Sequence, residues 1–497
     1  MKKQLLIPML VVLSLTALTG CKKKNNDSSM DIDADGDIVR DGDGNVVFDN
    51  VELKLWTVTT GDDANRQDEI INQFNTLYNG QIKVTAEHIS RYDLETNLIS
   101  TMEFDRAHGP DILFNHGNRT TEYNDRDWLY PIERYYEKTN TPLDKDDFVE
   151  SLLNATTING VMYGTPIDVH STMMEVRVDI LEKNGLEIPT NYDELCALSK
   201  TVVEKARAGQ FWIRGENSEN KPATEWRLAS TAEDYNVFPI AFGDMWVHEF
   251  VGYTAAVQNG AEIVANNGMP GWNNQGSVKG LQLLRNWMWP DANSKNQYGL
   301  SKAYGSDYDV GDAPFKAGTC LFKLQGPWAY QKEMNDFNIL LAKDGGAANI
   351  TTRNIGSMFA LDKTQAYAGK IKGEGHALML TKCVTSQTKA CAAAVFADYL
   401  AYFGGISWAK SGHIPAVKSV EKSQAFREDD AYDAYVKYWG TPDDYIVIPP
   451  TKYFSYIDTY FKTCVQQSMS SSNRSTSVQD IISQQYNDCL GYIELYA

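Results

Sequence analysis

Four polar residues that can bind a small molecule follow one short apolar segment. They are Asn115, His116, Asn118 and Arg119, in the stretch GPDILFNHGNR, where a predicted strand runs into a turn at Gly117. In open α/β sheets, ligands bind at the carboxyl ends of strands. These side chains therefore predict a site for a polar molecule, with turn formation around Gly117 as the alternative role of the two asparagines.

The motifs of common hydrolases and metalloenzymes do not occur in the sequence. There is no GxSxG, no HExxH and no zinc-ligand spacing, so we expect no catalytic residue, no metal and no cofactor. The cysteines beyond Cys21 form no CxxC pair and no cluster with histidine. They are Cys196, Cys320, Cys383, Cys391, Cys464 and Cys489. We interpret them as buried small residues, with a Cys464–Cys489 disulfide as an open alternative outside the cell.

The N-terminal segment has the layout of an export signal. Lys2 and Lys3 precede the apolar run LLIPMLVVLSLTALTGC, and the chain then becomes KKKNNDSSM. The run is short for a membrane span and Pro8 interrupts it. LTGC resembles the lipobox of bacterial lipoproteins, in which cleavage precedes the cysteine and the thiol carries a diacylglycerol. We expect a signal peptide over residues 1–20 and a membrane tether on Cys21, against the alternative of an ordinary signal with a chance cysteine.

Composition limits the classes of partner. The 497 residues provide for two or more domains with substantial cores, and the net charge of −19 argues against nucleic acid as a partner. Residues 21–50 are predicted to be the lipidated cysteine and an acidic linker. Within the linker, Asp31, Asp33 and Asp35 resemble the start of a calcium loop, but Gly42 occupies the place of the bidentate glutamate.

From residue 51 onward the chain alternates strands and helices. VELKLWTV has strand alternation, ANRQDEIINQFNTLYNG has apolar residues at helical spacing, and QIKVTAEHI is a second strand. This βαβ opening favours a parallel sheet covered by helices. Further on, YDEL after PTN predicts a helix start that Thr190 or Asn191 caps. The pattern predicts two α/β lobes.

The order of these pieces resembles the family 1 extracellular solute-binding proteins, the sugar receptors of bacterial ABC importers. The matching pieces span residues 51 to 497 and are LKLWTV with the following helix; GPDILFNHGNR and WLYPIERY; INGVMYGTPIDVHSTMMEVRVDILEKNGLEIPTNYDEL; FKAGTCLFKLQGPWAY; CAAAVFADYLAYF with SGHIPAV; and SYIDTYFKTCVQQ. The resemblance implies a periplasmic-binding-protein-like fold of type II, in which each lobe is a doubly wound sheet flanked by helices.

The resemblance also implies how the chain divides. Lobe 1 would comprise residues 51–170 plus 374–428, and lobe 2 residues 171–373 plus 429–497. Crossing strands are expected near Asp168–Thr172, Gly373–His376 and Arg427–Asp430. Segments 210–236 and 291–313 are longer than the family pattern and stay unassigned.

Residues that would hold the solute follow from the resemblance position by position. A sugar needs flat rings for its C–H faces and bidentate polar groups for its hydroxyls. Trp328, in GPWAY, matches the family's stacking tryptophan, with a core role as the alternative. Arg119 preserves an arginine of the family pattern, whereas Asn115 and Asn118 replace an aromatic residue and a carboxylate, which argues against maltodextrins. His170 occupies the position at which the family pattern has a glutamate in the cleft, with a structural role as the alternative.

Other expected ligand contacts come from both lobes. Trp246 and Glu249, in GDMWVHEFVGY, lie near the positions at which the family has an acidic and an aromatic residue. Asp458 occupies the position of a second stacking aromatic residue of the family, and Tyr456 would supply a ring in its place. Thr60 and Asp62 follow the first strand, where a carboxylate would accept two sugar hydroxyls and a helix N-cap is the alternative role of Asp62.

The expected function is capture of a carbohydrate, of oligosaccharide type, by closure of two lobes. A monomer tethered to the outer face of the cytoplasmic membrane would deliver the solute to the permease subunits of an ABC transporter. In a Gram-negative cell this face meets the periplasm. The alternatives are a binding protein for a peptide or polyamine, and a surface glycoside hydrolase.

Overall fold

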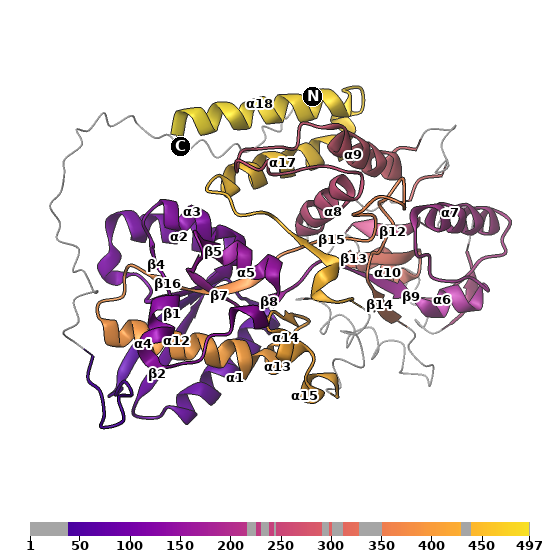
Figure 1. Ribbon diagram of the computed structural model, residues 1–497. Helices are drawn as coiled ribbons and strands as arrows, with labels where there is room; N and C mark the ends of the chain where they lie inside the picture. The colour runs from indigo at the N-terminus through magenta and orange to yellow at the C-terminus, as the bar shows by residue number, and fades with distance from the viewer. Residues whose placement is uncertain are drawn as a thin grey trace, which may run out of the picture.

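A computed structural model describes residues 38–215, 225–229, 238–242, 245–290, 298–300, 312–327, 350–428 and 439–496. The expected signal peptide, Cys21, Asp31 and Trp328 lie outside these residues. Figure 1 shows two α/β bodies side by side, joined by extended segments, which confirms the expected two-lobed α/β fold. The body that contains the sheet with β1 is called the first lobe, and the body that contains the sheet with β9 is called the second lobe.

The first lobe is built on a mixed sheet. Its strand order is β2 (Ile82–His88), β1 (Val51–Thr57), β3 (Ile112–His116), β16 (His376–Thr381) and β4 (Leu129–Tyr130), with β7 (Gly164–Pro166) also paired to β16. The strand β1 is parallel to β2 and β3, as the βαβ opening predicted. In contrast, β16 enters the sheet from the second half of the chain and is antiparallel to each of its partners.

The second lobe has a smaller sheet. Its order is β12 (Phe238–Phe242), β13 (Cys320–Gln325), β9 (Met173–Arg177) and β14 (Ile350–Arg353). The strands β12 and β13 are parallel, whereas β9 is antiparallel to both of its neighbours. All side chains of β9 and β13 are buried, since helices and loops cover the sheet.

Helices surround both sheets. Those of the first lobe are α1 (Gly61–Leu77), α2 (Arg91–Phe104), α3 (Thr120–Asp125), α4 (Glu133–Thr139), α5 (Glu150–Thr156), α12 (Gln387–Tyr402), α13 (Gly404–Ala409), α14 (Lys418–Glu421) and α15 (Gln424–Arg427). Those of the second lobe are α6 (Val178–Lys183), α7 (Tyr192–Arg207), α8 (Met245–Gln258), α9 (Gln275–Met288), α10 (Asp312–Ala317), α17 (Phe454–Met469) and α18 (Val478–Tyr496). The cap of α7 is Asn191, whose side chain accepts a hydrogen bond from the backbone N–H of Glu194 at 3.1 Å.

Two glycines let helices α8 and α9 approach closely. A Cβ atom at Gly276 would collide with the backbone of Gly260 and Ala261. A Cβ atom at Gly280 would collide with the backbone of Ala255 in α8. The first turn of α9 therefore packs against the backbone just after α8, and Gly280 of α9 packs against the backbone of α8 itself.

Extended segments join the lobes. The strand β8 (Asp168–Val169) pairs with β17 (Ile414–Pro415), and β15 (Ile371–Gly373) pairs with β18 (Tyr445–Val447). Between them, His170 and Glu374 form an antiparallel bridge with backbone hydrogen bonds of 2.8 and 2.9 Å. The chain therefore passes between the two sheets along paired backbone.

Residues 38–50, which precede β1, contain a turn. Arg40 and Val46 form an antiparallel bridge around a turn, and Asp41 Oδ1 accepts hydrogen bonds from the backbone of Asp43 and Asn45, both at 2.9 Å. Val46 is buried against the first lobe. The part of the expected linker that the structure describes thus packs on the protein.

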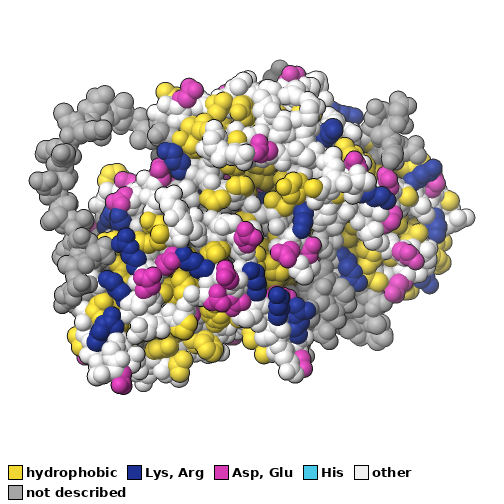
Figure 2. Space-filling view, in the orientation of Figure 1, with side chains coloured by type: hydrophobic (Ala, Val, Ile, Leu, Met, Phe, Trp, Pro, Cys, Tyr) yellow, Lys and Arg dark blue, Asp and Glu magenta, His cyan; other side chains and the backbone are white. Residues whose placement is uncertain are grey.

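The outer surface mixes charges of both signs. Figure 2 shows Lys and Arg side chains interspersed with Asp and Glu over the face in view, so the net charge of −19 does not gather into one acidic patch there. Among the helices in the described ranges, none combines the length and the apolar character needed to cross a membrane.

Candidate functional site

A cavity of about 430 Å³ opens at the carboxyl ends of β1, β2 and β3, and Phe250 of α8 reaches it from the second lobe. Its position follows the rule for ligand sites in open α/β sheets. The cavity is lined by Val58, Thr59, Thr60, Gly61, Asp62, Asp63, Ser90, Arg91, Tyr92, His116, His170, Phe250, Glu374, His376 and His413.

Strand pairing brings four of the seven histidines to the wall of this cavity. His376 is the cross-strand partner of His116, because β16 pairs with β3 in that register. The bridge to Glu374 brings His170 alongside them, and His413 lies one residue before β17, which pairs with the strand preceding His170. The rings of His170 and His376 stack with their centroids 4.7 Å apart.

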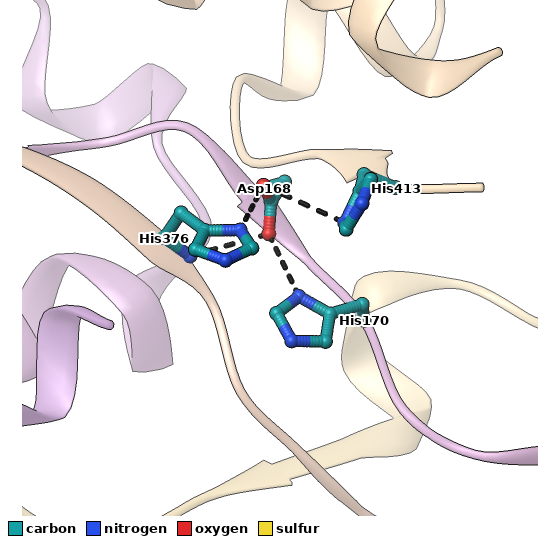
Figure 3. Close-up of side chains that lie close together, drawn as sticks. All are labelled: Asp168, His170, His376 and His413. Atoms are coloured by element: carbon teal, nitrogen blue, oxygen red, sulfur yellow. Dashed lines mark hydrogen bonds and ion pairs between the residues drawn. The ribbon is translucent and has the colours of Figure 1, made fainter. Parts of the chain in front are cut away.

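The carboxylate of Asp168 holds this cluster together (Figure 3). Its Oδ1 accepts a hydrogen bond from His170 Nδ1 at 3.1 Å and one from the backbone N–H of His376 at 3.2 Å. Its Oδ2 accepts from His376 Nδ1 at 2.8 Å and from Trp408 Nε1 at 2.5 Å, with His413 Nδ1 3.7 Å away. Both oxygens are therefore fully engaged, which fixes the orientation of the rings.

The buried histidines differ in their pKa values. Burial lowers the pKa of His170 to about 4 against the opposing effect of Asp168, and burial together with the charge of Arg91 holds the pKa of His116 well below its usual range. Burial also lowers the pKa of His413, but Asp63 and Asp168 outweigh it and raise that pKa. His116 and His170 are therefore neutral at pH 7.

A chain of buried ion pairs continues from the cavity into the second lobe. Lys372 Nζ lies 3.1 Å from Glu374 and 2.7 Å from Glu249 of α8, and Lys462 of α17 lies 2.9 Å from Glu249. Burial raises the pKa of Glu374, but the charges of Lys372 and Arg91 outweigh it, so that the pKa lies below its usual range. The ionised chain links the cavity wall to α8 and α17.

Four residues expected from the sequence lie at the cavity. Thr60 and Asp62 are exposed at the start of α1 and line its rim, and buried His116 and His170 line its wall. Thr60 precedes α1 without a capping hydrogen bond from its side chain. Their contact with a solute stays a prediction.

Three further expected residues lie beside the cavity and bind other side chains of the protein. Asn115 donates hydrogen bonds to Tyr123 Oη at 2.9 Å and to Glu95 at 3.2 Å, and Asn118 donates to Glu374 Oε1 at 3.3 Å. Arg119 pairs with Glu122 at 3.4 Å and donates to Ser455 of α17. Within the described part of the chain, these three do not line the cavity.

The remaining expected residues divide in two groups. Glu249 and Asp458 are buried in ion pairs with Lys372 and Lys462, and Tyr456 is half-buried with its ring 6.4 Å from that of Tyr492 in α18. The side chain of Trp246 and all of Trp328 lie outside the described residues. Their role in binding stays a prediction.

Several cavity residues were not expected from the sequence. Arg91 and Tyr92 begin α2, and Glu374, His376 and His413 join the wall from the second half of the chain. A helix start after a second parallel strand is a signal that would have found Arg91 and Tyr92. The cross-strand positions of His376 and His413 depend on a register that no local pattern reveals.

The two α/β lobes, joined by paired crossing segments around a polar cavity, define the class of two-lobed binding proteins. The family model for bacterial extracellular solute-binding proteins matches residues 69–434. The chain belongs to this family of bacterial extracellular solute-binding proteins. No curated protein matches it in sequence.

Solved structures share its fold at low sequence identity. The maltose/maltodextrin-binding domain MalE from Bdellovibrio bacteriovorus, bound to maltotriose, has a TM-score of 0.64 at 13% identity, over 89% of this chain and 100% of that chain. An ABC substrate-binding protein from Listeria monocytogenes, in complex with cycloalternan, has a TM-score of 0.64 at 16% identity, over 90% and 100%. The Thermus thermophilus maltotriose-binding protein, bound with maltotriose, gives 0.61 at 15%, over 89% and 100%.

Proposed function

We propose that this protein captures a carbohydrate, of oligosaccharide type, in the cavity between its two lobes and delivers it to the permease of an ABC transporter. The observation that carries the proposal is the cavity itself, at the carboxyl ends of β1, β2 and β3, with Phe250 of the second lobe in its wall. A solute there touches both lobes. The ligands in the similar structures, maltotriose and cycloalternan, support a sugar.

The chemistry of the cavity suits a neutral polyol. Tyr92 and Phe250 offer rings for the C–H faces of a sugar. Asp62 and the hydroxyl of Thr60 offer acceptors and a donor for its hydroxyls. The cavity of about 430 Å³ lies within the range of small-molecule pockets.

Capture follows from differential affinity. A solute that contacts both lobes binds the closed arrangement better and shifts the population by that difference alone. A shift from mostly open to mostly closed requires on the order of 5 kcal/mol. One stacked ring contributes about 1 kcal/mol, so several hydrogen bonds from both lobes must add to it.

The placement of the protein in the envelope is part of the proposal. The LTGC segment ending at Cys21 supports acylation of this cysteine and residence at the outer face of the cytoplasmic membrane. The protein would act as a monomer that binds without catalysis. Mass spectrometry of the membrane-extracted protein should show a diacylglycerol on Cys21, and Cys21→Ser should release the protein from the membrane.

A thermal-shift screen against glycans, amino acids, peptides and polyamines tests the solute class. We expect a glycan to raise the melting temperature, and Asp62→Asn to weaken binding of that glycan about tenfold, which is about 1.4 kcal/mol. Asp68→Asn is the control, because Asp68 is on the same helix, α1, and does not line the cavity. A shift with polyamines or peptides alone would assign the cavity to a charged solute.

A second measurement tests whether the protein only binds. The protein is incubated with the glycan that shifts its melting temperature, and reducing ends are counted over time. We expect their number to stay constant. New reducing ends would identify a glycoside hydrolase instead.

A further inference from the structure

We propose that His116, His170 and Glu374 bind a divalent transition-metal ion of the zinc class in the wall of the cavity. One ligand atom from each of these residues lies within 4.8 Å of the others. All three side chains are buried and line the cavity. The sequence did not predict this site, because the three ligands do not have the spacing of a known zinc motif.

The donor set and its geometry fit such an ion. Two imidazoles and one carboxylate are the protein ligands of zinc sites that keep one position open. With ligand atoms about 2.0–2.1 Å from a tetrahedral ion, neighbouring ligand atoms are about 3.3 Å apart. His116 Nε2 and Glu374 Oε2 are separated by 3.3 Å. The open position would face the cavity.

The protonation of His116 supports a cation between these two atoms. Asn115 uses its amide N–H groups to donate to Tyr123 and Glu95, so its Oδ1 accepts, and it lies 3.2 Å from His116 Nδ1. A neutral imidazole that donates through Nδ1 presents a lone pair at Nε2. Nε2 lies 3.3 Å from Glu374 Oε2, a buried oxygen without a hydrogen-bond partner in the described part of the chain.

The surroundings orient each ligand as metal sites require. Asp168 holds His170 through Nδ1 at 3.1 Å, which is the carboxylate–histidine arrangement that directs Nε2 toward an ion. Asn115 holds His116, and Lys372 Nζ and Asn118 bind Glu374 Oε1 at 3.1 and 3.3 Å. Glu374 Oε2 is thereby directed away from these two donors, toward His116.

A competing group of possible ligands is less suitable. Asp168, His170, His376 and His413 also bring ligand atoms within 4.8 Å of one another. However, Asp168 already accepts four hydrogen bonds from Trp408, His376 and His170. An ion bound to Asp168 would have to displace these donors, so the carboxylate acts better as the orienting group.

Arg91 opposes the ion from the side of Glu374 Oε2. Its Nη1 lies 3.5 Å from Glu374 Oε2 and would be repelled by a second cation. Nearby carboxylates offset this repulsion. Those that are buried around the cavity and the adjoining ion pairs are Asp63, Asp168, Glu249, Glu374 and Asp458, and they outnumber the lysines and the arginine paired with them.

Metal binding is tested on the purified, chelator-treated protein without sugar, so that the outcome is independent of the proposed solute. After zinc is added back and the excess is removed, we expect one zinc ion per chain by elemental analysis, and the metal-free protein should give a visible absorption band on addition of cobalt. His116→Gln and Glu374→Gln should each lower the affinity at least tenfold. His108→Gln, at an exposed histidine away from the cavity, should leave it unchanged.

Three outcomes would overturn the proposal. The first is no stoichiometric zinc in the unmodified protein, and the second is an undiminished affinity in folded His116→Gln. The third is loss of binding in His376→Gln with retention in His116→Gln, which would place the ion at Asp168. Because a variant can fail to fold, X-ray absorption of the zinc-bound unmodified protein gives a separate readout: two imidazoles and oxygen are expected, and sulfur ligands would refute the site.

Discussion

The guanidinium of Arg119, in the turn after β3, lies 4.8 Å over the ring of Phe454 in the first turn of α17. The same guanidinium donates to Ser455, and Ser455 in turn donates to Glu122 at 2.7 Å. A residue that the sequence resemblance assigned to the solute thus joins the first lobe to a helix of the second lobe. The contact stabilises the arrangement of lobes seen in the structure.

Replacement of Arg119 by alanine should destabilise the protein by about 3 kcal/mol, because it leaves the carboxylate of Glu122 buried with less compensation. Arg126→Ala is the matched control, since Arg126 also pairs with Glu122, at 3.3 Å, but is more exposed. Its cost should stay below about 1 kcal/mol. Urea unfolding measures both, and equal costs would contradict the assignment.

A glycine pair tests the close contact of α8 with α9. Gly280→Ala should cost more than about 2 kcal/mol, because the new methyl group overlaps the backbone of Ala255. Gly491→Ala, in α18 where no atom lies within 4 Å of the added Cβ, should stabilise by about 0.5–1 kcal/mol. Thermal melts of the two variants should therefore shift in opposite directions, and a shift in the same direction would contradict the packing.

Asp398 of α12 should make stability depend on pH. Burial raises its pKa from 3.8 to about 6. The folded state therefore holds the proton more tightly than the unfolded state, and this contribution to stability, complete below pH 3.8, is lost as the pH rises through 6. Asp398→Asn should thus stabilise the protein at pH 7.5 and have little effect at pH 3.5.

The expected gain at pH 7.5 is about 1–2 kcal/mol, which is the linkage for about two pKa units reduced for the partial exposure of Asp398. Denaturant unfolding of both proteins at the two pH values measures it. If the two proteins differ in stability by the same amount at both pH values, the pKa of Asp398 is not raised by folding.

The cysteines should all be thiols of low reactivity. The six cysteines from Cys196 to Cys489 are buried and unbridged, so the alternative of a Cys464–Cys489 disulfide is not seen. Burial raises the pKa of both Cys464 and Cys489 to about 12. A chain that begins after Cys21 should react slowly with a thiol reagent when folded and show six thiols in denaturant. Four thiols would indicate a disulfide.

Trp328 provides a prediction that rests on the resemblance alone. Trp328→Ala should abolish the thermal shift caused by the sugar and leave the melting temperature of the free protein within roughly a few degrees, since one stacking ring contributes about 1 kcal/mol. Loss of folding in this variant would instead assign Trp328 to the core.

The sequence pattern was sufficient to predict those strands, helices and caps that depend on residues close together in the chain. The alternation in VELKLWTV, the apolar spacing of the following helix and the cap at Asn191 are each set by residues a few positions apart. The antiparallel entry of β16 was not predictable in this way, because a segment more than two hundred residues after β3 supplies it. No periodicity encodes which strand pairs with which across that distance.

The same limit applies to the candidate site. His116, His170, His376 and His413 look like isolated histidines in the sequence, and only His116 and His170 were expected near a ligand. The register of β16 on β3, the bridge at Glu374 and the pairing of β8 with β17 bring them together. Conversely, the amides of Asn115 and Asn118 were chosen for their chemistry, which the fold uses on its own buried groups.

The two reciprocal backbone hydrogen bonds between His170 and Glu374 restrict how the halves of the molecule can move. A sliding motion would break both bonds at once, whereas a twist about the paired strands can preserve them. Opening and closing should therefore be torsional, with its pivot beside the cavity. Side chains at the pivot would swing least, so the floor of the cavity keeps its shape while its rim changes.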